Sequence, residues 1–148
     1  MELEEVWLQC NNINSLQSFS HCVNIKHIHM SANPIQSLVE VKHLLPLPRL
    51  THLSFSDIHF GKCSIVDEEG YKNYLILLLK QVQVLDGVVI NREHVQTAEE
   101  EYYSQVRGYN EALREIEDSY QKSLRAIDIQ HQVGMVCVYL LIYAHTPL

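Results

Sequence analysis

The 148-residue chain has little positive charge. Only 11 Lys and Arg residues stand against 18 Asp and Glu residues, so the formal net charge is -7 when the histidines are neutral. Affinity for nucleic acids is dominated by Lys and Arg side chains that neutralise phosphates. The charge balance therefore argues against nucleic acid as a partner.

Paired cysteines and a secretory signal are also missing. The first residues have neither the basic start nor the apolar stretch of a signal peptide. No Cys-x-x-Cys pair occurs, because the four cysteines are scattered over the chain: Cys10, Cys22, Cys63 and Cys137. We therefore expect a cytoplasmic protein with reduced thiols.

Long apolar runs are scarce too. One run covers residues 133–144, and as a helix it would extend about 18 Å, against about 30 Å for the hydrocarbon core of a bilayer. We expect no membrane span. The run matches neither a helical face nor a half-buried strand, so we describe residues 133–148 as an apolar tail of unknown role.

What the chain does contain is an internal repeat. Residues 25–35 read Ile-x-x-Ile-x-Met-x-x-Asn-x-Ile, a spacing that neither a helix nor a plain strand gives. The preceding unit starts 22 residues earlier and fills the same positions with Leu3, Val6, Leu8, Asn11 and Ile13. The pattern predicts short parallel strands, with the Asn of each unit turned inward to satisfy backbone groups of a tight bend.

Later units depart from the pattern. The third begins at Leu50 but has Ile58 at the Asn position, where we expect a buried side chain. A polar loop should follow to residue 70, and helical spacing predicts a short helix over residues 71–79. A closing repeat then runs from Val82 to Ile90.

These units resemble the leucine-rich-repeat consensus Leu-x-x-Leu-x-Leu-x-x-Asn-x-Leu. The ending, Tyr-x-x-Tyr-Leu and then Val-x-x-Leu-Asp-Gly-x-x-Ile, resembles the C-terminal cap of the short, 22-residue class. Within that class, the sequence resembles the phosphatase-1 regulatory subunit, the repeat-bearing tubulin-folding cofactor and the leucine-rich axonemal dynein light chain.

The resemblance implies an α/β fold: a right-handed leucine-rich-repeat solenoid with a parallel concave sheet over residues 1–91. It also implies a non-enzymatic protein without cofactors, whose partners belong to cytoskeletal, ciliary or phosphatase complexes. Solenoids need polar caps at both ends, and no cap precedes the first repeat. We therefore expect a fragment or splice form of a longer protein.

Residues 92–132 have a different composition, acidic and with alternating charge. Apolar residues recur there at three-four spacing and predict a long α-helix with a coiled-coil-like seam. Such a seam buries little in isolation, so we expect it to oligomerise or to dock on another protein. The predicted interface consists of Val106, Tyr109, Leu113 and Ile116.

The strands of the repeats should carry a partner-binding surface on their outward side. The repeat register predicts one row of Glu5, His27, His52 and Val84, and a second of Trp7, His29, Ser54 and Asp86. From these rows we predict partner contacts by Glu5, Trp7, His27, His29, His52, Ser54 and Asp86. An exposed Trp is a favoured interface anchor, unless a further repeat covers Trp7.

Three other interpretations use the same residues. The three histidines could bind Zn²⁺, with Glu5 or Asp86 supplying an oxygen. Ser54 and Ser56 lie near His52 and Asp57 in sequence, as a hydrolase would need, but neither serine sits in a nucleophile elbow. The module could also be a purely architectural spacer.

Overall fold

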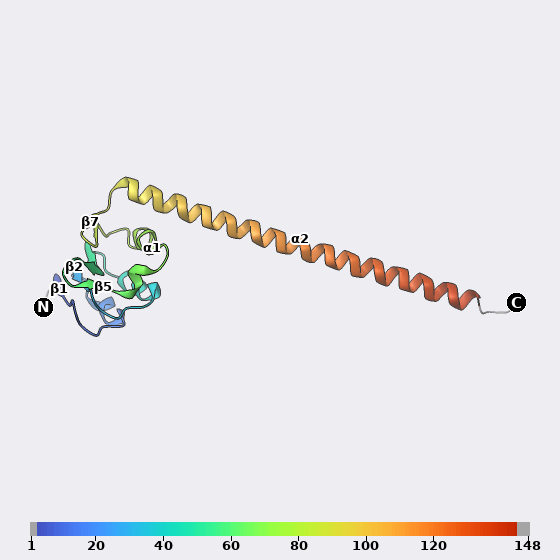
Figure 1. Ribbon diagram of the computed structural model, residues 1–148, viewed down its shortest axis with the longest axis horizontal. Helices are drawn as coiled ribbons and strands as arrows, with labels where there is room; N and C mark the ends of the chain where they lie inside the picture. The colour runs from blue at the N-terminus through green and yellow to red at the C-terminus, as the bar shows by residue number, and fades with distance from the viewer. Residues whose placement is uncertain (1–2, 145–148) are drawn as a thin grey trace. The chain divides into compact units, whose positions relative to one another are not determined.

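The computed structural model describes residues 3–144 and the side chains of residues 3–138. The chain divides into two compact units, residues 1–102 and 103–148. The first holds all the strands, and the second consists of helix as far as it is described (Figure 1).

A five-stranded sheet organises the first unit. Its order is β1 (Glu5–Trp7), β2 (His27–His29), β3 (His52–Ser54), β6 (Val84–Leu85) and β7 (Val88–Val89). The first four strands are parallel and β7 is antiparallel to β6. Figure 1 labels β1, β2 and β7 of this sheet.

The register confirms the first predicted row, and it confirms the second row from Trp7 to Ser54. Glu5 pairs with His27, His27 with His52, and His52 with Val84. In the second row Trp7 pairs with His29, and His29 with Ser54.

The other side of the sheet packs on the core. Aliphatic residues of the strands alternate with the outward rows and are buried, among them Ile28 and Leu53. The chain returns between strands through the 3₁₀ helices η1 (Gln17–His21), η2 (Leu38–Leu44) and η3 (Ser64–Asp67). Ser37 caps η2 by accepting a hydrogen bond from the Val39 N–H at 3.2 Å. The strand and return positions of the repeat thus form one core.

Asn33 turns inward as the pattern predicts, whereas Asn11, for which the pattern predicts the same, is exposed. Asn33 is only 3% exposed. Its Nδ2 donates to the carbonyls of Leu8 at 2.8 Å and Met30 at 2.7 Å, and its Oδ1 accepts from the Ile13 N–H at 3.0 Å. One amide therefore satisfies backbone groups of two successive bends, which explains a polar residue at a core position.

The prediction that Ile58 is buried was wrong. The chain forms a hairpin of β4 (Ser56–Asp57) and β5 (Gly61–Lys62) where a loop was expected, and Ile58 at its tip is 94% exposed. Cys63 is buried instead, and its thiol donates to the Met30 carbonyl at 3.1 Å. The hairpin turns Ile58 outward because Asp57 accepts hydrogen bonds from the tip backbone.

The predicted short helix is present as α1 (Tyr71–Leu78). After it, β6 and β7 form a second hairpin at Asp86 and Gly87. Both residues have positive φ angles, 51° and 77°, the backbone that an Asp-Gly turn between two strands adopts. This turn reverses the chain, so the last strand runs against the others.

Helix α2 (Arg92–Ala144) begins where the sequence predicts. Within the first unit Ala98 is buried, and Asn73 donates a hydrogen bond to Glu101. The predicted end at residue 132 was wrong, because α2 continues through the apolar run. Among the described residues, no helix is both long and apolar enough to cross a membrane.

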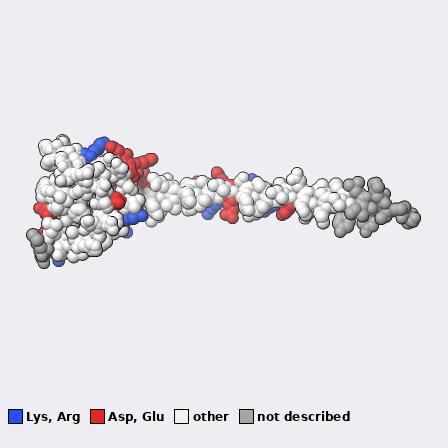
Figure 2. Space-filling model, turned by 90° about the horizontal axis from the view of Figure 1, so that it is seen from below, with Lys and Arg blue, Asp and Glu red and all other residues white. Residues whose placement is uncertain are grey.

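The side chains of residues 103–138 are all exposed. Figure 2 shows scattered patches of acidic and basic side chains on this stretch, whose visible surface is mostly uncharged. The predicted interface residues Val106, Tyr109, Leu113 and Ile116 are exposed with the rest. The seam exists in the helix, and its partner stays a prediction.

Candidate functional site

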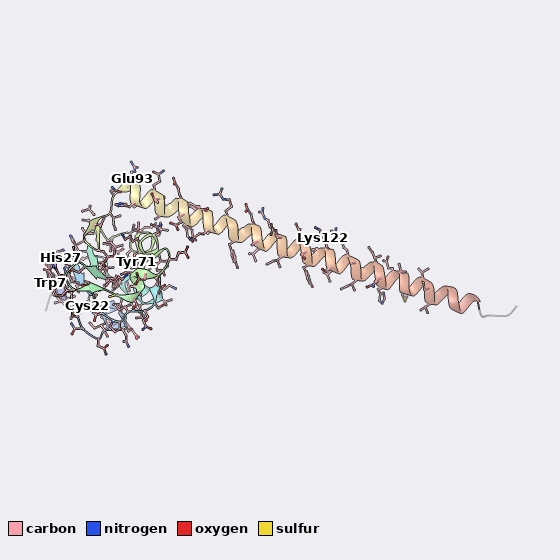
Figure 3. The ribbon with its side chains drawn as sticks, in the orientation of Figure 1. Trp7, Cys22, His27, Tyr71, Glu93 and Lys122 are labelled. Atoms are coloured by element: carbon pink, nitrogen blue, oxygen red, sulfur yellow. The ribbon has the colours of Figure 1, made fainter. Side chains whose placement is uncertain are left out.

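The outward side of the sheet brings six of the predicted site residues together. We call this surface the histidine face and define it by Glu5, Trp7, His27, His29, His52 and Ser54. Three neighbouring parallel strands, β1, β2 and β3, supply two residues each. Figure 3 marks Trp7 and His27 on this part of the molecule.

Trp7 and His29 form an aromatic stack at one end of the histidine face. Their ring centroids are 4.0 Å apart and the ring planes differ by 13°. Glu5 holds the histidine from the side, since its Oε1 lies 3.5 Å from His29 Nε2 and 3.5 Å from His27 Nδ1. Trp7 remains 63% exposed. The tryptophan is thus oriented by its neighbours and still open to a partner.

The other pair of imidazoles lies between β2 and β3. The rings of His27 and His52 have centroids 4.2 Å apart and are tilted by 57°. Partial burial, followed by the positive charge that His27 and His29 can acquire, holds the pKa of His52 below its usual value. His52 therefore stays neutral to lower pH than an isolated histidine does.

A groove of about 550 Å³ adjoins the stack. Residues of β2, β3 and β6 line it, among them His29, His52 and Val84. The hairpin forms one side through Asp57 and Ile58, and the turn at Asp86 and Gly87 also lines the groove. Because His29 belongs to both the stack and the groove, the two form one continuous surface.

Asp86 is a structural residue. Its Oδ1 accepts hydrogen bonds from the backbone N–H groups of Phe55 at 2.8 Å and Ser56 at 2.9 Å, and its Oδ2 accepts from the Tyr71 hydroxyl at 2.9 Å. Burial, followed by the Asp86 charge, raises the pKa of Tyr71, so that hydroxyl remains a donor. The assignment of Asp86 to partner contact stays a prediction, and its carboxylate also holds the bend after β3.

The zinc interpretation finds no support. In residues 3–138, no three His, Cys, Asp or Glu side chains are placed to hold a metal ion. Instead, the Glu5 carboxylate orients the imidazoles of His27 and His29. The His29 ring in turn stacks on Trp7.

The hydrolase interpretation also lacks the required contacts. The Ser54 hydroxyl donates to the Ser56 carbonyl at 2.9 Å, and His52 Nδ1 lies 2.9 Å from Thr51 Oγ1. Asp57 accepts from the hairpin backbone. These hydrogen bonds stabilise turns and do not align a nucleophile with a base.

The sequence interpretation missed the hairpin side of the groove. Ile58 is exposed there and Phe60 is 48% exposed. The available signal was Asp57 followed by Gly61, because Asp begins turns through its side chain and Gly61 adopts a φ of 99° that favours glycine. The aliphatic Ile58 outweighed this signal in the repeat alignment.

The fold has counterparts among known proteins. The crystal structure of the Drosophila melanogaster SNF/U2A' complex contains a chain similar to this one, with a TM-score of 0.58 and 21% sequence identity over 66% of this chain and 55% of that chain. U2A' is a leucine-rich-repeat protein, and at this identity the likeness shows a shared leucine-rich-repeat fold.

A curated protein from Caenorhabditis elegans, the uncharacterized protein F09G8.5, is 28% identical over 99 residues, or 67% of this chain. The chain spans only 21% of the length of that protein. No protein-family profile matches the sequence.

Proposed function

We propose that this chain is a non-catalytic protein-interaction module. The histidine face binds a helix or an extended segment of a partner protein, and α2 docks the module on a larger assembly or joins two copies. A solved structure with a similar fold is that of a protein complex, which supports interaction with proteins as the general role.

The observation that carries the proposal is the exposed stack of Trp7 on His29 beside the groove. Tryptophan is enriched among the residues that dominate binding energies, above all when neighbours hold it in place. His29 and Glu5 hold Trp7 before any partner arrives. The neighbouring groove gives apolar side chains of a partner a place beside this anchor.

The resemblance to short leucine-rich-repeat proteins suggests the type of assembly. We propose a cytoskeletal, ciliary or phosphatase-type complex inside the cell. The support is the Leu85-Asp86-Gly87 sequence, which resembles the cap of that class and here makes the turn between β6 and β7.

The test is quantitative capture of proteins from a cell extract by the full chain. We expect Trp7→Ala combined with His29→Ala to lose the captured partner, because both side chains point away from the core and their removal leaves the fold intact. The melting temperature of the double variant should match that of the wild type.

Val39→Ala provides the matched control, since Val39 is also an exposed apolar residue but lies in η2. Capture should persist in this control. Equal capture by the wild type and the double variant would contradict binding at the histidine face and would favour either α2 as the docking element or the architectural spacer.

A further inference from the structure

The indole of Trp7 has one ring face open to solvent. Its other face lies against His29, yet 63% of the residue is exposed. A carboxylate borders this stack, because Glu5 Oε1 lies 3.5 Å from His29 Nε2. A flat aromatic surface next to a negative charge attracts a cation, most favourably a planar one.

Building on the proposed function, we propose that the partner places an arginine side chain on the histidine face. Its guanidinium stacks on the open face of Trp7, and Glu5 provides the opposing charge. The guanidinium is planar, weakly hydrated and always charged, so it can stack on the Trp7 indole and pair with the Glu5 carboxylate at the same time. Lysine offers a compact and strongly hydrated charge that matches Glu5 but has no flat face for the indole.

The charge of the first unit agrees with a cationic ligand. Residues 1–102 contain seven Lys and Arg against thirteen Asp and Glu, which gives -6 of the total of -7. A field of this sign attracts basic segments and repels acidic ones. Lys26, which directly precedes β2, is paired with Glu4 at 2.9 Å, and its charge is already included in this sum.

Glu5 is the carboxylate of the two outward rows that remains accessible. Asp86 uses both oxygens for the Phe55 and Ser56 backbone and for the Tyr71 hydroxyl. The Glu5 side chain is 43% exposed, and its contacts are to imidazole nitrogens of His27 and His29, each at 3.5 Å. An arriving guanidinium can therefore pair with Glu5 without breaking the bend after β3.

The experiment titrates N-acetyl-L-arginine N-methylamide into the ¹⁵N-labelled full chain and follows the indole N–H signal in NMR spectra. Trp7 is the single tryptophan, so one signal reports the site. We expect saturable shifts, with an affinity about two- to fivefold higher than that of the uncharged citrulline analogue. Glu5→Gln should remove this preference. Equal affinity of the wild type for the two compounds would overturn the inference.

Glu4→Gln is the matched control, because it removes the same charge from the neighbouring residue. The arginine preference should survive in it. If Glu4→Gln and Glu5→Gln reduce the preference equally, the effect is a general field and no arginine site exists.

The same titration separates this inference from the proposed function. Capture that depends on Trp7 and His29, without any preference for the arginine compound, would keep the interaction module and remove the arginine. A clear preference combined with capture that ignores both residues would leave an arginine-binding surface on the histidine face, but it would contradict both the proposed function and the use of that surface by the captured partner.

Discussion

The two units of the chain differ in what covers their apolar side chains. In residues 3–102, aliphatic residues of four repeats meet in one core, and Asn33 and Asp86 satisfy the bends between strands. In residues 103–138, an equally regular apolar seam is exposed along its whole length. Regular spacing therefore creates a core only where successive repeats stack on one another, and a single helix needs another chain for the same purpose.

This comparison can be tested because each unit has its own spectroscopic probe. The fluorescence of Trp7 reports the sheet, since no other tryptophan exists. The far-ultraviolet circular dichroism is dominated by α2, which has 53 residues. The predictions below use the two probes and run from the largest expected effect to the smallest.

Leu53→Ala should have the largest effect. Leu53 is 2% exposed in the centre of β3, and truncating a buried leucine costs about 2–5 kcal/mol through lost burial and a cavity. The Trp7 fluorescence melt should move to much lower temperature. Ile129→Ala in the exposed stretch is the control and should leave that melt unchanged. A wild-type melt for Leu53→Ala would contradict its place in the core.

Asn33→Leu should cause the second-largest loss of stability, although it adds apolar surface. The substitution removes the hydrogen-bond partners of Leu8, Ile13 and Met30 backbone groups, at a cost of about 1–3 kcal/mol. Asn24→Leu, placed before β2, should have a much smaller effect in the same denaturant titration. Equal losses at the two positions would remove the special role of Asn33.

Glu40→Ala should lower stability by about 1 kcal/mol at neutral pH. The Glu40 carboxylate accepts hydrogen bonds from the Leu16 N–H at 2.8 Å and the Ser15 hydroxyl at 2.7 Å, and these bonds hold the pKa of Glu40 below its usual value of 4.5. A lowered pKa stabilises the fold above that value, and this contribution disappears as the pH falls further.

The difference between Glu40→Ala and wild type should therefore shrink below about pH 4.5. Urea titrations at several pH values measure it. A difference that stays constant down to pH 2.5 would mean that the ionised carboxylate does not contribute.

Substitutions in the seam of α2 should leave the fluorescence melt unchanged and act on association. We expect the full chain to self-associate or to pair with a partner helix through Val106, Tyr109, Leu113 and Ile116, since these positions form an a/d seam. Leu113→Glu with Ile116→Glu should abolish self-association in analytical ultracentrifugation. Glu115→Ala, between them, is the control. If the wild-type chain is monomeric at every concentration, self-association is wrong and docking on a different protein remains as the role of the seam.

A sequence pattern predicts a contact well when the residues that make it lie close together in the chain, and poorly when they lie far apart. The first outward row, the second row as far as Ser54 and the role of Asn33 depend on alternation and spacing within one repeat, so they were predicted correctly. Asp86 has the spacing of an outward residue, yet backbone N–H groups 30 and 31 residues away in sequence take up its carboxylate. Contacts at that separation leave no local pattern.

Ile58 and the end of α2 show a second reason why predictions from the sequence pattern failed. An aliphatic residue at a repeat position predicts burial, but the backbone bonds of Asp57 turn the chain into a hairpin before that position is reached. In α2, the uniform apolar run after residue 132 has no periodicity, so it carries no signal for or against a helix. The helix continues there because nothing in the run interrupts its backbone bonding.

The most direct test of the interaction role is hydroxyl-radical footprinting of the full chain, free and bound to the partner that it captures. Mass spectrometry then measures the oxidation of each exposed side chain. The account predicts strong protection of Trp7 and His29 on binding, weaker protection of Ile58 beside the groove, and no change at Val39 in η2. Oxidation of Trp7 and His29 at the same rate in the free and the bound chain would contradict it.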